Sequence, residues 1–364
     1  MRELRVELGA RSYPIYIGDN LLNHISTYFE QHRISKISPI LIITDDNIAS
    51  IHLTKVEDLL RQGGFKTATK VIVSGEQSKS LVVFEEMITA ALQAGLDRNS
   101  AVIALGGGVV GDLAGFVAAS FMRGVKFVQI PTTILAHDSS VGGKVAVNHR
   151  LAKNIIGAFH QPEFVLYDTS TLLTLPERQI KAGLAEVIKH GLIWDINFTS
   201  WIDEHAEKLL ALDSGALQYA LYQGCLIKSI VVSRDEKEND LRAILNLGHT
   251  IGHALEAVAQ YNELLHGEAI SIGMVGAARL AMKCGYSEQI YTETKRILTK
   301  LGLPTKLSNE MSTHCIMEAM MHDKKFKEGL MTFIIPTEIG KVEINSSISA
   351  KWVQEVIEEL KQEG

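Results

Sequence analysis

The stretch AVIALGGGVVGDLAGFVAA, residues 101–119, joins an apolar run to a helical pattern through a glycine-rich turn that begins at Gly106. A short apolar run that ends in glycines is typical of a buried strand. A glycine-rich turn before a helix lets the backbone approach a phosphate group closely and directs N–H groups of the helix start toward it. A plain tight turn lined with small residues would need the same glycines. The stretch therefore indicates a strand, a turn and a helix, with a phosphate site as one of two explanations.

With the run at residues 101–108, four apolar runs follow one another, the others being at residues 39–47, 70–76 and 126–133. Helix-like segments separate the first three of these four runs. This alternation is typical of a parallel sheet with crossover helices. From about Pro176 the pattern changes to a period of 3.6 residues, with few candidate strands. We therefore expect an α/β nucleotide-binding (Rossmann-like) domain at residues 1–170 and an all-α, mainly helical domain at residues 171–364.

The glycine-rich turn departs from the usual dinucleotide-binding pattern. Its spacing is not G-x-G-x-x-G, and no acidic residue follows a second strand about 20 residues later. An acidic candidate for a ribose instead lies upstream, in TDDN at residues 44–47. If Asp45 or Asn47 holds a ribose, the ribose-binding residue precedes the phosphate-binding turn along the chain, which is the reverse of the usual order. This order predicts a nucleotide fold that is related to the standard dinucleotide domain but distinct from it.

Length and composition limit the function classes. The 364 residues are enough for two domains, each with its own core, and 46% hydrophobic and 21% charged residues are ordinary for a globular chain. A formal charge of −6 predicts no binding to nucleic acid or to an anionic membrane. The three cysteines are far apart and form no C-x-x-C pair, which is typical of a protein in a reducing compartment. With no signal peptide and no apolar run of membrane-spanning length, we expect a cytoplasmic protein.

The stretch LNLGHTIGHALE, residues 245–256, places His249 and His253 four residues apart, so a helix would project both rings from one face. It resembles the metal motif H-E-x-x-H, but Thr250 stands where that motif has its glutamate. A third histidine, His266, follows 13 residues after His253. Spacing alone does not select two metal ligands from these three histidines.

A carboxylate candidate lies in GLAEVIKHGLIW, residues 183–194, where Glu186 and Lys189 share one helix face. The simplest interpretation is a surface ion pair. The surrounding segment is apolar, however, and a semi-buried carboxylate needs a counter-charge, which a metal ion could supply. Two histidines and one carboxylate would suit a catalytic divalent site with open positions.

A polar segment at residues 131–162 contains residues that could hold an anion. Lysines among glycine, asparagine and serine supply positive charges with rotatable donors. Taken singly, each lysine could equally be a solvated surface residue. The candidates of this segment are Thr132, Thr133, Asp138, Lys144, Asn148, Lys153 and Asn154.

The motifs GGGVVGD, PTT, DSSVGGK, KNIIGAF, GLAEVIKHG, LNLGHTIGHALE, HGEAI and DKK occur in this order and together resemble the 3-dehydroquinate synthase family over roughly residues 40–340. The resemblance implies a dehydroquinate synthase-like fold, with an NAD-binding first domain and a metal- and substrate-binding second domain. It implies a lyase, usually a homodimer, that needs NAD and one divalent ion, Zn or Co. The family acts in the shikimate pathway, which leads to chorismate and the aromatic amino acids.

The resemblance also implies a substrate and a course of reaction. The substrate is 3-deoxy-D-arabino-heptulosonate 7-phosphate, and the products are 3-dehydroquinate and phosphate. In the family, a ring hydroxyl is transiently oxidised by NAD, phosphate is eliminated, the ketone is reduced again, and an intramolecular aldol step closes the new ring. NAD is therefore a catalyst that is not consumed.

The resemblance also implies which residues form the site, because positions in this sequence match the functional residues of the family. Metal ligands would be Glu186, His249 and His266, with His253 beside the substrate. Catalytic roles would fall to Lys144, Asn154, Lys189 and His253, and substrate contacts to Arg123 (reaching the neighbouring subunit), Lys153, Lys228, Arg242, Asn246 and Lys324. Cofactor contacts would be Asp45, Asn47, Ser74, Gly75, Glu76, Gln77, Ser78, Lys79, Gly107, Gly108, Val109, Val110, Gly111, Asp112, Thr132, Thr133, Asp138, Lys144, Lys153, Thr171, Leu172, Leu173 and Thr174.

Two segments depart from the family pattern. LAHDSS is one residue shorter than in many members, and Arg150 and Ala152 replace a proline and a glycine before Lys153 and Asn154. We expect an intact site with altered local loops. The alternatives are a sister sugar phosphate cyclase such as 2-deoxy-scyllo-inosose synthase, a metal-dependent polyol dehydrogenase that releases NADH, and a non-catalytic nucleotide-binding module. His253 favours dehydroquinate synthase over the sister cyclase.

Overall fold

The computed structural model describes residues 1–238, 240–259, 264–321, 326–327 and 330–362. The chain forms two compact units. The first contains Met1–Leu175 and Leu217–Ser233, and the second contains Pro176–Ala216 and Arg234–Gly364. The predicted ranges 1–170 and 171–364 do not include this return of residues 217–233 to the first unit. Helical periodicity is the same whichever neighbour a helix packs against, so sequence patterns do not reveal such a return.

The first unit is built on a sheet whose strands follow the order β1-β2-β9-β6-β5-β3-β4. β1 and β2 are antiparallel, and the pairs from β2 onward are parallel. The strands are β1 (Arg2–Val6), β2 (Tyr13–Gly18), β3 (Ile40–Asp45), β4 (Thr67–Ile72), β5 (Ala101–Gly106), β6 (Lys126–Pro131) and β9 (Phe164–Asp168), and a separate hairpin pairs β7 (Lys144–His149) with β8 (Ala152–Phe159).

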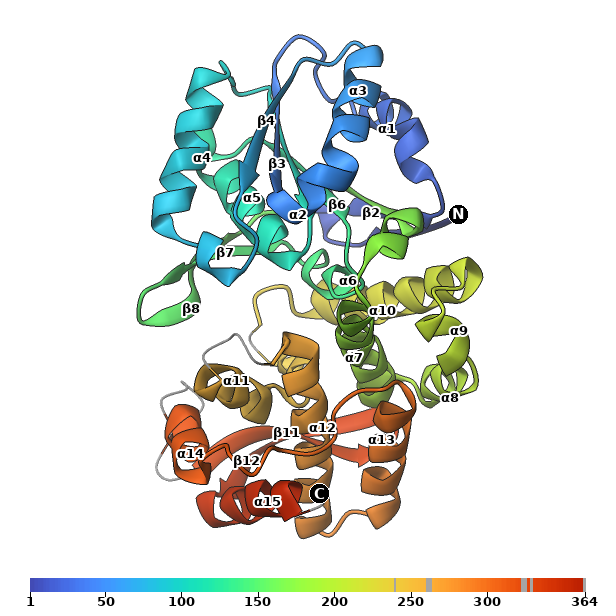
Figure 1. Cartoon of the computed structure of the whole chain (residues 1–364), viewed down its shortest axis with the longest axis vertical. Helices are drawn as coiled ribbons and strands as arrows, with labels where there is room; N and C mark the ends of the chain where they lie inside the picture. The colour runs from blue at the N-terminus through green and yellow to red at the C-terminus, as the bar shows by residue number, and fades with distance from the viewer. Residues whose placement is uncertain (239, 260–263, 322–325, 328–329, 363–364) are drawn as a thin grey trace. The chain divides into compact units, whose positions relative to one another are not determined.

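Helices cover both faces of this sheet (Figure 1). They are α1 (Ile25–Gln31), α2 (Asp46–Ile48), α3 (Thr54–Gln62), α4 (Leu81–Gln93), α5 (Gly108–Ser120) and α6 (Ala136–Ser139), with short turns at η4 (Glu76–Ser78), η5 (Phe121–Arg123) and η6 (Thr169–Thr174). Ile40 and Ile42 of β3 pack into the core under α1 and α3, whereas Leu41 and Ile43 pack into the core under α4 and α5. A strand buried on both faces is apolar throughout, which is why the sequence alone indicated these strands. The α/β prediction is confirmed.

The order of the parallel strands explains the reversed nucleotide motif. From β3 the chain moves outward to β4, returns to β5 on the other side of β3, and continues through β6 to β9. Ligands of open α/β sheets bind outside the carboxyl ends of the strands, at the point where the order reverses. Here that point lies between β3, which ends at Asp45, and β5, which ends at Gly106. The acidic residue therefore precedes the glycine-rich turn in the sequence.

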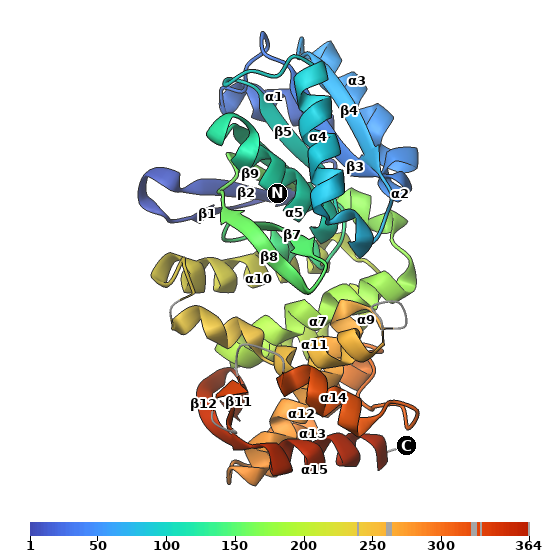
Figure 2. The same ribbon diagram turned by 90° about the vertical axis from the view of Figure 1, so that its left-hand side faces the viewer.

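The second unit is mainly helical, as expected. Its helices are α7 (Glu177–Trp194), α8 (Ile196–Glu204), α9 (Ala206–Leu210), η7 (Leu241–Asn246), α11 (His249–Val258), α12 (His266–Lys283), α13 (Glu288–Lys300), α14 (Thr313–Met321) and α15 (Ala350–Gln362), while α10 (Ser214–Arg234) runs on into the first unit. α12 contacts α7, α11, α13 and α15 (Figure 2). Among the described helices, none is long and apolar enough to cross a membrane.

A three-stranded antiparallel sheet in the second unit was not predicted. It consists of β10 (Phe326–Lys327), β11 (Leu330–Glu338) and β12 (Lys341–Ser349). β12 buries Ile348 but leaves most of its other residues exposed or half-buried. Such a strand has little apolar sequence, because its stability comes from pairing and from one covered face. The prediction of an all-α domain therefore needs this addition.

Asp203 near the end of α8 forms ion pairs with two basic residues of α13. Arg296 donates from Nη1 to Oδ1 at 3.0 Å and from Nη2 to Oδ2 at 2.8 Å, and Lys300 Nζ lies 3.0 Å from Oδ1. The hydrogen bonds from Arg296 are the main reason that the pKa of Asp203 falls to about 2.

We predict that Asp203→Asn lowers the free energy of unfolding by about 1 kcal/mol or less at neutral pH, because the partners are partly exposed to solvent. The pKa of Asp203 is lower in the folded chain, so its contribution is fully present above the ordinary value of 3.8 and is lost as the pH falls toward about 2. Urea unfolding of both proteins from pH 7 down to the lowest pH at which both still fold measures the difference. A difference that does not shrink in acid would contradict the ion pair.

Candidate metal centre and nucleotide site

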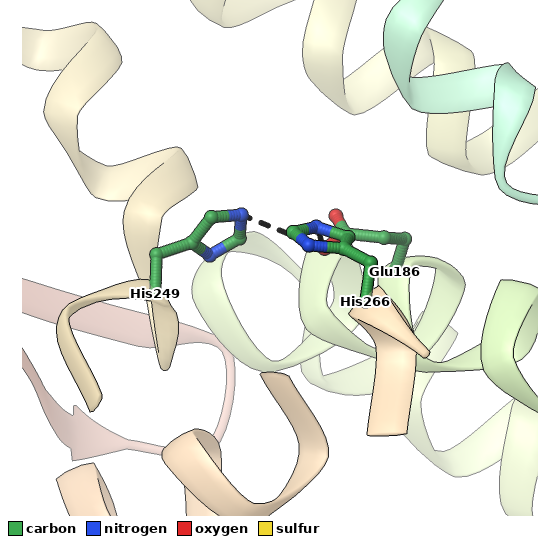
Figure 3. A group of neighbouring side chains, drawn as sticks. All are labelled: Glu186, His249 and His266. Carbon is green, nitrogen blue, oxygen red and sulfur yellow. Dashed lines mark ion pairs between the residues drawn. The ribbon is translucent and has the colours of Figure 1, made fainter. Parts of the chain in front are cut away.

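Three potential metal ligands converge in the second unit (Figure 3). Glu186 lies within α7, His249 is the first residue of α11, and His266 is the first residue of α12. The Nε2 atoms of His249 and His266 each lie 3.6 Å from Oε1 of Glu186. One ligand atom from each of the three residues lies within 4.8 Å of the other two. The three side chains are therefore arranged around one point.

Two glycines allow the helices to come close enough for this arrangement. A Cβ atom on Gly267 would lie 1.8 Å from the carbonyl oxygen of Ala182 on α7, and one on Gly273 would lie 2.0 Å from that of Gly248. No side chain fits at such distances, so only glycine permits these contacts. Gly267 places the start of α12, and with it His266, directly against the helix that carries Glu186.

Hydrogen bonds orient both imidazole rings. Nδ1 of His249 lies 3.1 Å from the carbonyl oxygen of Leu247, and Nδ1 of His266 lies 3.1 Å from Oε2 of Glu256. Both partners are acceptors, so a neutral ring would carry its proton on Nδ1 and offer the lone pair of Nε2 to a metal ion beside Glu186. Metal-ligating histidines are typically held in this way, by a carbonyl or carboxylate at the far nitrogen.

The electrostatic environments of the two histidines differ. Glu186 and Lys189 are each 1% exposed and form an ion pair through Oε2 of the glutamate. Burial, and then Lys189, lower the pKa of His249 well below its usual range. Burial also lowers the pKa of His266, but the hydrogen bonds to Glu186 and Glu256 outweigh it and raise that pKa to about 9. Two imidazole nitrogens and a buried carboxylate oxygen are a donor set that fits zinc or cobalt.

His253 occupies a different position from the other two histidines. It is exposed, and its ring centroid lies 5.1 Å from that of His249 and 5.9 Å from that of His266. Its ligand atoms group with those of Glu256 and His266, within 4.8 Å. The structure thus brings Glu186 together with His249 and His266, whereas His253 lies beside this group.

Two other predicted residues of the second unit, Arg242 and Asn246, lie in η7. Arg242 is buried, and its Nη1 donates to the carbonyl oxygen of Glu236 at 2.5 Å. Asn246 Nδ2 lies 3.3 Å from Oε1 of Glu238. Lys324 lies outside the described residues.

Most of the predicted cofactor residues lie at the carboxyl ends of five parallel strands, which meet at one edge of the sheet. Two others, Lys144 and Lys153, lie in the β7–β8 hairpin. At the end of β3 are Asp45 and Asn47; after β4, Ser74, Gly75, Glu76, Gln77, Ser78 and Lys79; after β5, Gly107, Gly108, Val109, Val110, Gly111 and Asp112; after β6, Thr132, Thr133 and Asp138; and after β9, Thr171, Leu172, Leu173 and Thr174.

The turn from β5 into α5 suits a phosphate group. A Cβ atom on Gly106 would lie 2.7 Å from Cγ2 of Val110, so glycine is needed for the strand to enter the helix directly. Gly107 is the N-cap, and among the described residues no side chain caps this helix start. The buried Oγ1 of Thr132 has no hydrogen-bond partner within the described part of the chain. Uncapped helix N–H groups and a nearby hydroxyl fit the pyrophosphate of a dinucleotide.

Lys79 connects residues from three predicted segments. Its Nζ donates to Oδ2 of Asp112 at 2.6 Å and to Oδ1 of Asn154 at 2.5 Å. The backbone N–H of Asn154, which has a φ of 56°, donates to Oδ1 of Asn148 at 2.8 Å. Burial raises the pKa of Asp112, and Lys79 opposes this change. These contacts hold the β7–β8 hairpin although Arg150 and Ala152 replace the family residues at its turn.

Several further predicted residues of the first unit are already engaged or exposed. Oδ1 of Asp45 accepts from the backbone N–H of Ile48 at 2.9 Å, which caps α2. Lys228 is buried, and its Nζ lies 2.7 Å from Oδ2 of Asp138 and also donates to the carbonyl oxygen of Asp138. Lys144 and Arg123 are exposed, and Lys153 is half-buried.

Glu256 and Gly267 contribute to this site although neither was predicted from the sequence. Glu256 follows His249 by seven residues, and two helical turns place both on one face of α11, a signal that was available in the motif itself. Gly267 directly follows His266 in HGEAI. The need for glycine there depends on the backbone of α7, so the sequence around it contains no sign of it.

Comparisons with known proteins agree with this geometry. The family model described as 3-dehydroquinate synthase N-terminal matches residues 69–182, and the one described as 3-dehydroquinate synthase C-terminal matches residues 183–326. The chain is 49% identical over 346 residues to the 3-dehydroquinate synthase of Desulforamulus reducens, covering 94% of this chain and 96% of that protein.

Two solved structures resemble the whole chain. A 2-deoxy-scyllo-inosose synthase complexed with carbaglucose-6-phosphate, NAD+ and Co2+ is similar with a TM-score of 0.91 and 26% identity, covering 98% of this chain and 99% of that one. The 2-epi-5-epi-valiolone synthase of Streptomyces hygroscopicus subsp. jinggangensis 5008, with NAD+ and Zn2+ bound, is similar with a TM-score of 0.88 and 25% identity, covering 98% of both chains.

We predict that Gly267→Ala separates α12 from α7 and destroys the metal centre, because the new methyl group would overlap the carbonyl oxygen of Ala182. The free energy of unfolding should fall by about 3 kcal/mol or more, as for other overpacked positions. Metal analysis and urea unfolding measure the two effects.

The matched control is Gly215→Ala in the first turn of α10, where a Cβ atom lies at ordinary contact distance, 3.4 Å from Asp213. It should leave metal content unchanged and be neutral or slightly stabilising, because alanine favours helix more than glycine does. Equal effects of the two substitutions would argue against the backbone contact.

Proposed function

The chain belongs to the 3-dehydroquinate synthase family, and from this we infer that it is a carbon–oxygen lyase that uses NAD and a divalent metal ion. Its reaction converts 3-deoxy-D-arabino-heptulosonate 7-phosphate to 3-dehydroquinate and phosphate in the shikimate pathway. The observation that carries this function in the structure is the meeting of two imidazole Nε2 atoms at one carboxylate oxygen, at 3.6 Å each.

We propose that Glu186, His249 and His266 hold the metal ion and that the residues at the carboxyl edge of the sheet hold NAD. When bound, NAD supplies a reversible hydride acceptor, and the ion supplies a Lewis acid that polarises a hydroxyl group. The buried Glu186 with its two oriented imidazoles supports the metal assignment. The uncapped start of α5 and the buried hydroxyl of Thr132 support the cofactor assignment.

For the substrate, we propose contacts from the residues that match family positions. They are Arg123, Lys144, Lys153, Asn154, Lys189, Lys228, Arg242, Asn246, His253 and Lys324. The buried guanidinium of Arg242 is held by the Glu236 carbonyl, and a fixed guanidinium suits a carboxylate or phosphate. Many cations favour departure of a phosphate group, because they stabilise the charge that develops on it.

We propose that His253 moves protons at the substrate. It is exposed, yet its ring lies edge-on to that of His249. An accessible imidazole near a metal ligand set can accept or donate a proton at neutral pH without being a ligand itself. Lys144 and Asn154 both lie on the β7–β8 hairpin and would orient the reacting groups.

We further propose a cytoplasmic homodimer. Arg123 is exposed on η5, and its φ of 67° and that of Met122, 48°, fix the turn in the left-handed region. A constrained, exposed arginine is suited to a phosphate held by a second copy of the chain. The three cysteines form no disulfide among the described residues, which suits a reducing compartment.

The activity is tested by incubating the protein with the heptulosonate phosphate, catalytic NAD and Zn2+ or Co2+. We expect one phosphate released per substrate consumed, 3-dehydroquinate as the product, and no net accumulation of NADH. Net NADH from a polyol would instead indicate a dehydrogenase, and turnover of glucose 6-phosphate would indicate a sister cyclase. Activity that survives treatment with a chelator would contradict the metal requirement.

The ligand assignment is tested by His249→Ala and His253→Ala. We expect the first variant to lose bound metal, because it removes one of the two Nε2 donors that face Glu186. The second should retain metal with near-wild-type affinity and lose most of its activity. Metal content after dialysis and turnover rate are measured on both variants. Loss of metal from the His253 variant to the same extent would overturn the assignment.

A further inference from the structure

Glu256 on α11 contacts His266 of the candidate metal centre on the side of the ring that faces away from Glu186. The residue is 8% exposed, and Oε2 lies 3.1 Å from Nδ1 of His266, the nitrogen that faces away from Glu186. This distance is that of a direct N–H···O hydrogen bond. Glu256 therefore contacts a candidate ligand without belonging to the group of three.

The backbone at His266 is held by other contacts. Glu268 accepts from the backbone N–H of Leu265 at 2.8 Å and so caps α12, and Arg178 binds both oxygens of Glu268 at 2.6 and 2.7 Å. These bonds fix where the helix begins, but the imidazole of its first residue can still rotate about its side-chain bonds. The hydrogen bond from Nδ1 to the carboxylate of Glu256 limits this rotation and fixes the orientation of the ring.

The two imidazoles are held by partners of different charge. Nδ1 of His249 faces the neutral carbonyl of Leu247, whereas Nδ1 of His266 faces a carboxylate. A carboxylate at the far nitrogen fixes the tautomer and also makes Nε2 a stronger donor to a metal. His266 is thus equipped to be the more basic of the two nitrogen ligands.

We propose that Glu256 is a positioning residue for the metal centre: it holds the Nδ1–H of His266 so that Nε2 points to the ion beside Glu186. This inference rests on the proposed role of Glu186, His249 and His266 as metal ligands. It differs from a second metal site made of His253, Glu256 and His266, whose ligand atoms also lie within 4.8 Å of one another. In such a site the carboxylate of Glu256 would bind an ion, whereas in our proposal it accepts the hydrogen bond from Nδ1 of His266.

The test uses Glu256→Ala and Glu256→Gln in the full-length protein. Affinity for Co2+ and Zn2+ is measured by competition with a chelator, the number of ions per chain by metal analysis, and ligand geometry by the visible absorption spectrum of the Co2+ form. We expect Glu256→Ala to weaken metal binding about 10- to 100-fold and to alter the cobalt spectrum. Glu256→Gln should weaken it less, because the amide oxygen still accepts the hydrogen bond but carries no charge.

The control is Asp203→Asn, which removes an ion pair in the same unit and should leave affinity, stoichiometry and the cobalt spectrum unchanged. Wild-type affinity and spectrum in Glu256→Ala would overturn the proposal. If that variant does not fold, wild-type affinity in Glu256→Gln overturns it instead. Two ions per wild-type chain, one of them lost from the Glu256 variants, would indicate the second metal site. No ion bound by the wild-type protein would refute the proposed ligand set itself.

Discussion

The contact between the backbones of α7 and α12 at Gly267 is the constraint on which the candidate metal centre depends. It brings His266, at the start of one helix, to Glu186, in the middle of another, although 80 residues separate them. A second close contact, between Gly273 and Gly248, sets the start of α11 and the position of His249. Because both contacts are between main chains, the ligand positions follow from helix packing and not from flexible loops, which favours a preorganised site.

This packing buries the carboxylate of Glu186, and the negative charge of that carboxylate must be compensated. Glu186 is paired with Lys189 through one oxygen and faces two imidazoles through the other. A buried ion pair gives little net stability, since desolvation offsets most of the attraction. The arrangement is better explained by chemistry, because a carboxylate with two oriented nitrogen donors is suited to a divalent cation. Glu256 serves the same arrangement from a position next to it, because its carboxylate orients one of the two imidazole donors.

In the first unit the sheet has the same organising role. Strands that end at one edge gather residues from five separate stretches of sequence, and the reversal of strand order between β3 and β5 is the point at which sheets of this kind bind their ligands. Lys79 then connects the loop after β4 to Asp112 on α5 and to Asn154 on the β7–β8 hairpin. The departures at Arg150 and Ala152 are accommodated because these contacts, and not the turn residues, hold the hairpin.

Local sequence patterns were enough to predict the parallel α/β sheet, the glycine-rich turn into α5 and the mainly helical second half, since these depend on local periodicity and on apolar runs buried on both sides. The sequence also identified the candidate ligands, but spacing could not select between His253 and His266. An i,i+4 pair shares a helix face whatever that face contacts, so local geometry favoured His249 with His253. The family resemblance assigned His249 and His266 as ligands, and the tertiary structure shows that these two imidazoles face Glu186. The contact of Glu256 with His266, the sheet of β10 to β12 and the place of residues 217–233 in the first unit became visible in the tertiary structure alone. Distances between helices depend on packing, and packing depends on residues far away in the chain.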